Sequence, residues 1–478
     1  MLSEARDWID GEWHAPEVSL GGWIRDASDA GILQEQRATS DGALERAIAA
    51  SLRAHADGLW SGARVDARAA ALDRIAAAIE VREEAIAEAD AQMTGVLLAV
   101  TRRLAKVASL AFRNAASLIR GGALAIDLGG AGAVELRHEG WGPAAIVAPW
   151  NAPIAIAAHK VASALAAGCT VVLKGSEHAP RSCQLLAEAI EAANLPRGVF
   201  QLVHGAGGVG ARLVADPRMR AVSFTGGLEA GVSIALACAA QLKPVQLELG
   251  GNNPLIVLED ADLELATRGI VAGLVTLNGQ WCRAVGRVVV ARSVAGELVE
   301  RVMARLASLR MGSALSPSSE MGPLAYPAHL VRVRAAIGAL VERGAVSHVT
   351  TRAPELRGNF LAPTLLTGVA PQAARDEIFG PVATVHPVVG DDEAVAVANA
   401  SPFGLAAYVF GGERARAVAG RVRAGSIKVN GVSLLALHPS APRPAWGLSG
   451  LVDEGSRETL RFFCGTRVIG DASKEMLG

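Results

Sequence analysis

The stretch "GPAAIVAPWNAPIAIAAHKVASALAAGCTVVLKG" at residues 142–175 decides the fold. Its apolar run at 144–150 predicts a buried strand, residues 153–167 predict a helix, and "CTVVLKG" at 169–175 predicts a second strand. A strand, a helix and another apolar strand form a βαβ unit, which requires a parallel sheet with covered faces. The stretch therefore predicts an α/β protein.

The same alternation continues toward the C-terminus. Helices are predicted over 180–193, 207–215 and 228–241, between the strands "VFQLVHG" (199–205), "MRAVSFTGG" (219–227) and "KPVQLELGG" (243–251). A second α/β pattern, over 254–435, predicts a separate domain. Outside these two patterns, amphipathic helices are predicted over 40–57, with Ser40 and Asp41 as caps, and over 66–92. A Gly-rich hairpin is predicted over 121–138, and a final strand in "RETLRFFCGTRVIG" (457–470).

Composition narrows the class of protein. The chain has 478 residues, 51% of them hydrophobic and 19% charged, with a formal net charge of -1, which indicates a well-buried globular protein with no affinity for nucleic acid. Five cysteines without a CxxC pair indicate neither a disulfide framework nor a metal site. No signal segment and no run of about 20 apolar residues is seen. These features predict a cytoplasmic protein that does not bind membranes.

Polar and glycine residues follow the predicted strands of the first sheet. Ligands bind at the carboxyl ends of such strands, and here those ends carry Trp150–Asn151, Lys174–Glu177, Gly205, Thr225–Gly227 and Glu248–Gly251. "GAGGVG" at 205–210 matches the GxGxxG pattern, but the acidic residue expected about 20 positions later does not end a strand. "FTGG", which opens a helix with two glycines, is the better candidate for a pyrophosphate site.

Cys282, in "LNGQWCRAVGR" (277–287), is a candidate nucleophile. Gly279 suggests a turn before it, and Arg283 and Arg287 supply positive charge, which lowers the pKa of a thiol. The alternative interpretation is a buried, inert cysteine, as most lone cysteines are.

Three further residues have a chemical and a structural interpretation. Asn151 either stabilises a turn between two prolines or donates to an oxygen that gains negative charge. Glu248 is either half of an ion pair or a general base. Glu377, in "EIFGPV" (377–382), either ends a helix or holds a ribose hydroxyl.

Seven segments together resemble the aldehyde dehydrogenase superfamily in order and spacing, over roughly residues 5–470. They are "PWNAPI", "TVVLKGSE", "FTGG", "LELGGNNP", "NGQWC", "EIFGPV" and "SPFGLAA". "GGNNPLIVLEDADLELA" is most similar to the benzaldehyde and vanillin dehydrogenase branch. The resemblance implies a Rossmann-like parallel-sheet NAD-binding domain (1–120 and 139–245), a second α/β catalytic domain (246–435) and a small β oligomerisation element (121–138 and 436–478).

The resemblance also implies roles for individual residues. Cys282 corresponds to the nucleophile, Glu248 to the general base, and Asn151 with the Cys282 N–H to the oxyanion donors. Glu177 would accept from the ribose hydroxyls and repel a 2′-phosphate, so NAD is favoured over NADP. The positions that match cofactor contacts are Trp150, Lys174, Glu177, Gly207, Phe224, Thr225, Gly226, Gly227, Leu249, Glu377 and Phe379.

Three segments depart from the family pattern. Gly175 in "KGSE" replaces the usual proline, and Gly227 in "FTGG" replaces the usual serine. Both changes put cofactor affinity in doubt. "RPAWGLSG" at 443–450 replaces a glycine-rich segment beside the substrate entrance.

Small side chains occupy positions where the family's substrate tunnel often has large aromatics. Ala152, Ala155, Ile156, His159 and Thr276 fall there, which predicts a bulky or aromatic aldehyde unless Trp281, Trp446 or a shifted loop refills the space. Arg283 either binds an acidic substrate or is a surface or backbone-bonding arginine.

The reaction implied is oxidation of an aldehyde to a carboxylic acid through a cysteine thioester that Glu248 helps water to hydrolyse. Two alternatives remain open: a CoA-acylating relative, and a catalytically degenerate homologue that keeps the fold. The hairpin at 121–138 and the strand near 459–470 predict a homodimer or homotetramer, because unpaired strand edges favour a partner.

Overall fold

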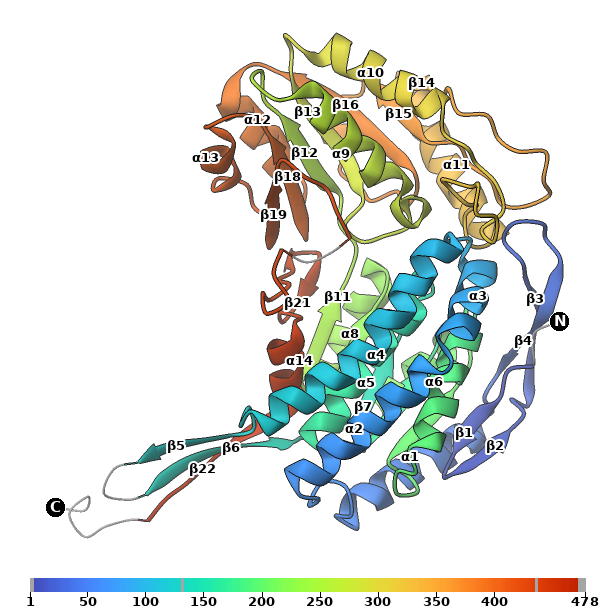
Figure 1. Cartoon of the computed structure of the whole chain (residues 1–478), viewed down its shortest axis with the longest axis vertical. Coiled ribbons are helices and arrows are strands. Elements are labelled where there is room, and N and C mark those ends of the chain that lie inside the picture. The colour runs from blue at the N-terminus through green and yellow to red at the C-terminus, as the bar shows by residue number, and fades with distance from the viewer. Residues whose placement is uncertain (1–3, 130–132, 435–436, 472–478) are drawn as a thin grey trace.

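The fold is described from a computed structural model, which covers residues 4–129, 133–434 and 437–471. Two large sheets with flanking helices form the upper and lower parts of the molecule in Figure 1, and a thin three-stranded sheet projects from the lower part. Within these ranges, no helix is both long and apolar enough to cross a membrane. The α/β fold with parallel-sheet domains is confirmed.

The first sheet has the order β2-β1-β9-β8-β7-β10-β11-β21, and its five central strands are parallel. Their bounds agree with the predicted series: β7 (Ala144–Val147), β8 (Val171–Lys174), β9 (Phe200–Val203), β10 (Ala221–Thr225) and β11 (Val245–Glu248). The sequence pattern did not predict the antiparallel edge strands β1 (Asp7–Ile9), β2 (Glu12–His14) and β21 (Gly450–Leu451), nor the separate pair β3 (Val18–Arg25) and β4 (Ile32–Ala38).

Helices cover both faces of this sheet and form two apolar cores. One face packs against α5 (Pro153–Ala167) and α6 (Pro180–Ala192), and α2 (Val65–Glu80), α3 (Glu83–Thr94) and α4 (Leu98–Arg120) pack over these two helices in the same core. The other face packs against α1 (Asp41–Ala56), α7 (Gly207–Ala215) and α8 (Leu228–Ala239). The chain builds β8 and β9 on one side of β7, and β10 and β11 on the other. The order therefore reverses between β7 and β10, where doubly wound sheets bind ligands.

The second sheet has the order β14-β15-β16-β13-β12-β18-β19, parallel except for β14. Its strands are β12 (Asn253–Val257), β13 (Val285–Ala291), β14 (Val346–His348), β15 (Thr364–Thr367), β16 (Val382–Val388), β18 (Ala406–Phe410) and β19 (Ser426–Val429). Its helices are α9 (Leu263–Val275), α10 (Ala295–Ala307), α11 (Pro327–Glu342), α12 (Gly390–Asn399) and α13 (Ala415–Ala419). Cys282 immediately precedes β13, and "EIFGPV" runs into β16. These motifs therefore lie at the amino ends of the second sheet.

Two predicted elements differ in the structure. The prediction of one continuous helix over 66–92 is wrong, because α2 ends at Glu80 and α3 begins at Glu83. Both helices bury their apolar residues in the core that holds α4, so the apolar period continues across the break and hides it. The strand over 457–470 is correct only from Cys464, because α14 (Ser456–Phe462) precedes β22 (Cys464–Ile469). Leu460 is fully buried against the same core, which favours a helix there.

The three-stranded sheet contains the hairpin predicted over 121–138. β5 (Ala125–Gly129) pairs with β6 (Val134–Gly140), and β22 pairs with the other edge of β6. Residues 130–132 of the hairpin lie outside the described residues. So do residues 435–436 and 472–478, toward the C-terminus. The domain boundary proposed at 245–246 falls inside β11, a strand of the first sheet.

Candidate active site

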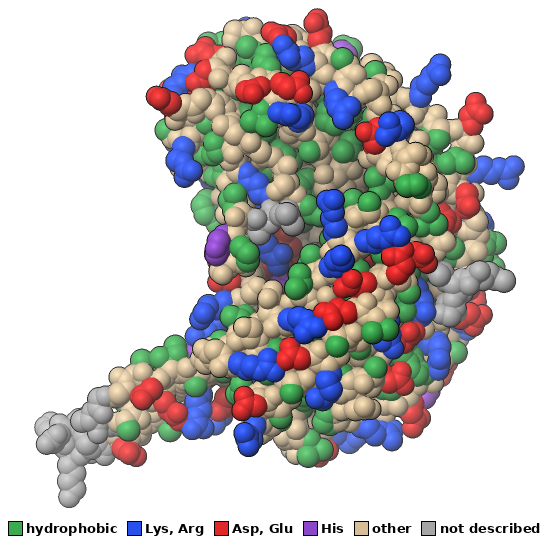
Figure 2. All heavy atoms as spheres, in the orientation of Figure 1, with side chains coloured by type: hydrophobic (Ala, Val, Ile, Leu, Met, Phe, Trp, Pro, Cys, Tyr) green, Lys and Arg blue, Asp and Glu red, His purple; other side chains and the backbone are tan. Residues whose placement is uncertain are grey.

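A cavity of about 1860 Å³ lies between the two sheets, and Figure 2 shows the surface hollowed between the upper and lower parts. It is large for a single small ligand, since such sites usually measure roughly 300–1,000 Å³. All the site residues proposed above line it except Trp446. Trp446 is exposed on β20 (Trp446–Gly447), which pairs with β17 (Phe403–Gly404), so its placement in the substrate site is not supported.

Cys282 follows a turn whose backbone is unusual. Leu277 and Asn278 have φ values of 48° and 56°, and Gly279 has a φ of 73°. A Cβ atom on Gly279 would lie 2.3 Å from the backbone nitrogen of Pro381, so only glycine fits. The "NGQWC" and "EIFGPV" segments are therefore packed backbone to backbone, and this contact sets where the turn delivers Cys282.

Side-chain amides fix the backbone around Cys282. The Asn253 amide donates to the carbonyl oxygens of Cys282 (2.9 Å) and Ala284 (2.7 Å). The Asn278 amide donates to the carbonyls of Gly95 (2.7 Å) and Pro323 (2.8 Å). Because both asparagines are almost fully buried, these bonds are expensive to break. Cys282 therefore has a rigid support.

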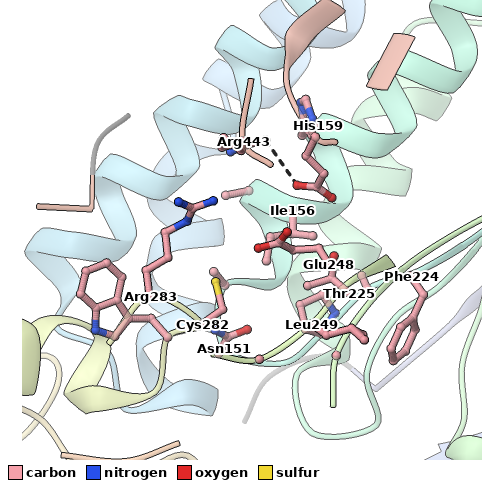
Figure 3. A pocket seen from close by; sticks show the side chains of 18 of the residues that line it. Asn151, Ile156, His159, Phe224, Thr225, Glu248, Leu249, Cys282, Arg283 and Arg443 are labelled. Carbon is pink, nitrogen blue, oxygen red and sulfur yellow. Dashed lines mark hydrogen bonds and ion pairs between the residues drawn. The ribbon is translucent and has the colours of Figure 1, made fainter. Parts of the chain in front are cut away.

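Asn151 and Glu248 face the same space as Cys282 (Figure 3). Asn151 lies between β7 and α5, and its amide donates to the Gln280 carbonyl at 2.9 Å. Glu248 ends β11, and its carboxylate has no hydrogen-bond partner among the described residues. Two strand ends and the turn before β13 thus bring together three residues that lie far apart in the chain, at positions 151, 248 and 282.

Burial changes the acid–base properties of both reactive groups. Burial is the largest effect that raises the pKa of the Glu248 carboxyl, and the nearby Glu454 carboxylate raises it further. Burial also raises the pKa of the Cys282 thiol, as does the charge of Glu248, while Arg283 opposes the rise. Arg283 thus lowers the pKa of Cys282 as predicted, but burial outweighs its charge and the net shift of that pKa is upward. Arg287 does not help, because its guanidinium is buried and donates to the carbonyls of Asn252, Val397 and Ala398.

A buried ion pair beside Glu248 was not predicted. Lys160, on α5, is fully buried, and its Nζ lies 2.6 Å from Glu454 and donates to Ser223 at 2.8 Å. Arg443 lies 3.5 Å from the other oxygen of Glu454. These cations lower the pKa of Glu454, although burial alone acts to raise it. A lysine inside an otherwise apolar helix is the sequence signal, because a buried lysine needs a charged partner.

The cavity continues past β7 and β8 toward the proposed adenosine end. The Lys174 Nζ lies 3.4 Å from the Glu177 carboxylate. Burial acts to raise the pKa of Glu177, but the charges of Lys174 and His178, together with hydrogen bonds to the carboxylate, outweigh burial and lower that pKa. A Cβ on Gly175 would lie 3.2 Å from the Cys183 sulfur. The missing proline at 175 thus makes room for a neighbouring cysteine.

The phosphate end of the cavity has unused hydrogen-bonding groups. The Thr225 hydroxyl is buried without a partner in the described structure. Gly227 is the N-cap of α8, no side chain caps this helix, and a Cβ on Gly227 would meet nothing within 4 Å. A helix N-terminus with free N–H groups favours an anion.

Glu377 and an aromatic cluster line the middle of the cavity. The Gly251 N–H donates to the Glu377 carboxylate at 2.8 Å, and a Cβ on Gly250 would overlap that carboxylate. Trp150 contacts the rings of Tyr326 (5.4 Å between centroids) and Phe379 (5.5 Å), and His178 stacks on Tyr326 at 3.7 Å. His178 and Tyr326 were not predicted, since no sequence motif marks either.

Comparisons with known proteins agree with this architecture. The model of the aldehyde dehydrogenase family matches residues 24–469. The chain therefore belongs to the aldehyde dehydrogenase family, a class of oxidoreductases that oxidise aldehydes. The predicted resemblance and the predicted enzyme class are confirmed.

Individual relatives show the range of the similarity. A 3-succinoylsemialdehyde-pyridine dehydrogenase of a Pseudomonas species is 36% identical over 437 residues, which is 89% of this chain and 91% of the relative. A geranial dehydrogenase of Castellaniella defragrans is 34% identical over 433 residues, 89% of this chain and 90% of the relative. The crystal structure of Staphylococcus aureus betaine aldehyde dehydrogenase in complex with NAD+ superimposes with a TM-score of 0.91 at 29% identity, covering 98% of this chain and 95% of that structure.

Gly279→Ala tests the packed turn. The added methyl group overlaps the Gly380–Pro381 backbone and forces alanine into a left-handed conformation, so the free energy of unfolding should fall by about 2 kcal/mol or more, measured by urea denaturation. The control is Gly338→Ala on α11, where an added Cβ meets nothing within 4 Å and helix propensity favours alanine. Equal stability of the two variants would contradict the role of the contact.

Proposed function

We propose that the protein oxidises an aldehyde to a carboxylic acid with NAD, through a covalent thioester on Cys282. The observation that carries this proposal is the meeting of Cys282, Asn151 and Glu248 in one cavity. That cavity continues to Glu177 and to the uncapped N-terminus of α8.

Each of the three residues has a defined part. The Cys282 thiol loses its proton, and its sulfur adds to the aldehyde carbon while the carbonyl oxygen takes the electron pair. Asn151 and the Cys282 N–H donate to that oxygen; one such donor is typically worth about 10²–10³ in rate. After oxidation the acyl group is bound to sulfur as a thioester. Glu248 then takes a proton from water, the resulting hydroxide attacks the acyl carbon, and the thiolate leaves.

The groups that line the rest of the cavity fit NAD. The Glu177 carboxylate suits ribose hydroxyls, and the free Thr225 hydroxyl and the N–H groups at Gly227 suit a pyrophosphate. Glu377, held against Gly251, is a second carboxylate for a ribose. When bound there, NAD supplies the hydride acceptor for the oxidation. A 2′-phosphate would meet the Glu177 charge, which favours NAD over NADP.

The substrate proposed is a bulky or aromatic aldehyde. Ala152, Ile156 and Thr276 line the cavity, and Trp281 does not close it, because its indole is buried and donates to the Gly273 carbonyl at 3.2 Å. Leu434 and Leu437 add apolar wall from the segment before Trp446. An apolar passage of this kind favours large apolar groups.

A CoA-acylating reaction is the second candidate for the fate of the thioester. The buried Glu248 carboxylate disfavours it, because a general base beside the thioester promotes attack by water. Product analysis with and without CoA separates the two: a free acid whose yield CoA does not change supports hydrolysis.

A symmetric oligomer is also proposed. The three-stranded sheet extends away from the body in Figure 1 and exposes apolar side chains, namely Ile126, Leu128, Val468 and Ile469. β5 leaves one edge of this sheet unpaired. Exposed apolar groups beside a free strand edge favour pairing with a second copy, in a homodimer or homotetramer.

Glu248→Gln tests the hydrolytic step. The variant should still release about one NADH per active site in a burst, while steady turnover falls by about 10²–10⁴. In the wild type, burial raises the pKa of Glu248 to about 7. Hydrolysis of the thioester should therefore become faster as the pH rises through about 7 and the carboxyl loses its proton. The variant should lack this rise. Cys282→Ala is the control that loses the burst as well, and a burst in that variant would contradict the covalent step.

Glu177→Gln tests the choice of cofactor. Removing the charge should lower the ratio of kcat/KM with NAD to kcat/KM with NADP by about 10- to 100-fold, the worth of a charged hydrogen bond. Glu191→Gln, at an exposed position on the neighbouring α6, is the matched control. An unchanged ratio in Glu177→Gln would refute the assignment of this residue.

A series of neutral aldehydes tests the width of the passage. From acetaldehyde through hexanal to benzaldehyde, kcat/KM should rise by about 10-fold or more. The reason is that burial of each added apolar group in the passage stabilises the bound transition state. Ile156→Trp should reverse the order by narrowing the cavity. A wild-type kcat/KM that falls steadily with substrate size would sink the wide-passage hypothesis.

A further inference from the structure

The Arg283 guanidinium is an unused cation in the cavity. Its side chain is partly buried and lines the space beside Cys282, and Figure 3 shows it extending from the Cys282 turn toward Arg443. Among the residues that the structure describes, only its backbone oxygen has a partner, the Tyr408 hydroxyl at 2.7 Å. Within the described residues, the guanidinium is bonded to no backbone carbonyl, which argues against the backbone-bonding alternative.

Neighbouring cations, unlike the Arg283 guanidinium, have protein partners for their side chains. Arg287 donates to three backbone carbonyls, and Arg443 lies 3.5 Å from the Glu454 carboxylate. The Lys428 ammonium donates to the Ser433 carbonyl at 2.7 Å. A guanidinium that lines the cavity without a hydrogen-bonded protein partner is free to bind a ligand there.

The Glu248 carboxylate interacts with Arg283, whose charge acts to lower the pKa of that carboxyl. Cations still outnumber carboxylates at the substrate end, where Arg283, Arg443, Lys160 and Lys428 lie with Glu248 and Glu454. Glu454 is already paired with Lys160 at 2.6 Å. His159 adds no charge at neutral pH, because burial lowers its pKa to about 3. Burial lowers the pKa of Lys428, and the charge of Arg283 lowers it further, so two cations repel one another at this wall. An anion bound between them would relieve that repulsion.

We propose that Arg283 binds a carboxylate on the far end of the substrate, so that the preferred substrates are aldehydes with a second, anionic group. The inference rests on the proposed function, in which the aldehyde carbon meets the Cys282 sulfur. A guanidinium presents two parallel N–H groups that match the two oxygens of a carboxylate. The apolar wall formed by Ile156 and Leu437 would contact the part of the substrate between the aldehyde and the carboxylate.

Two other roles for Arg283 make different predictions. If Arg283 only lowers the pKa of Cys282, its loss slows the oxidation of every aldehyde by the same factor. If the flat face of the guanidinium stacks on an aromatic ring of the substrate, loss of Arg283 slows the oxidation of neutral and anionic benzaldehydes equally. Only a carboxylate contact makes the effect depend on the charge of the substrate.

The kinetic experiment compares substrates matched in size. The first pair is 4-formylbenzoate and the neutral 4-formylbenzamide, and the second is 4-oxobutanoate and 4-methylpentanal. The wild type should favour each anion in kcat/KM by about 10-fold or more, and Arg283→Gln should abolish that preference. Arg283→Lys should keep part of it, because the charge remains without the fork. Arg268→Gln, at an exposed position on α9 outside the cavity, should keep all of it.

A binding experiment tests the same contact without turnover. By calorimetry with the NAD-loaded Cys282→Ala protein, 4-formylbenzoate should bind about 10-fold or more tightly than 4-formylbenzamide, and the added Arg283→Gln change should remove the difference. The inference is overturned if the preference for anions is absent in the wild type, or persists in Arg283→Gln, in either experiment. An absence of NADH formation with every aldehyde would refute the proposed function instead, and the binding result would then decide the inference alone.

Discussion

The backbone on either side of Cys282 is the fixed point of this molecule. Asn253 holds the Cys282 carbonyl, Asn278 ties the preceding turn to two other segments, and Gly279 lies against the Gly380–Pro381 backbone. In the proposed mechanism, a nucleophile on this rigid turn cannot move to its substrate. The substrate, the oxyanion donor and the base must all be placed relative to it, and placement within a fraction of an ångström decides how much of the barrier orientation removes.

The two sheets contribute opposite ends to the site. The first presents the carboxyl ends of β7, β10 and β11, which carry Asn151, Thr225 and Glu248. The second presents the amino ends of β13 and β16, which follow Cys282 and Glu377. The proposed nucleophile therefore comes from a different sheet than the proposed oxyanion donor and the proposed base. A low-dielectric cavity between them explains why the carboxyl of Glu248 and the thiol of Cys282 both hold their protons more tightly than in water.

Much of the first sheet could be predicted, because short Val- and Leu-rich runs alternate with helices and the polar residues fall at strand ends. Local pattern could not reveal the edge strands β1 and β2, which are set by pairing with β9, nor the break between α2 and α3. In the site, Cys282, Glu248 and Asn151 have motifs around them. The Lys160–Glu454 pair and the His178–Tyr326 stack do not, since each joins positions far apart in the chain. The direction of the Cys282 pKa also depends on burial, which adjacent residues do not show.

The backbone contact between Gly279 and Pro381 also links two stretches of sequence that lie about a hundred positions apart. A change in the length or shape of one requires a matching change in the other. Chimaeras with related enzymes should therefore exchange residues 277–287 and 377–382 as a unit.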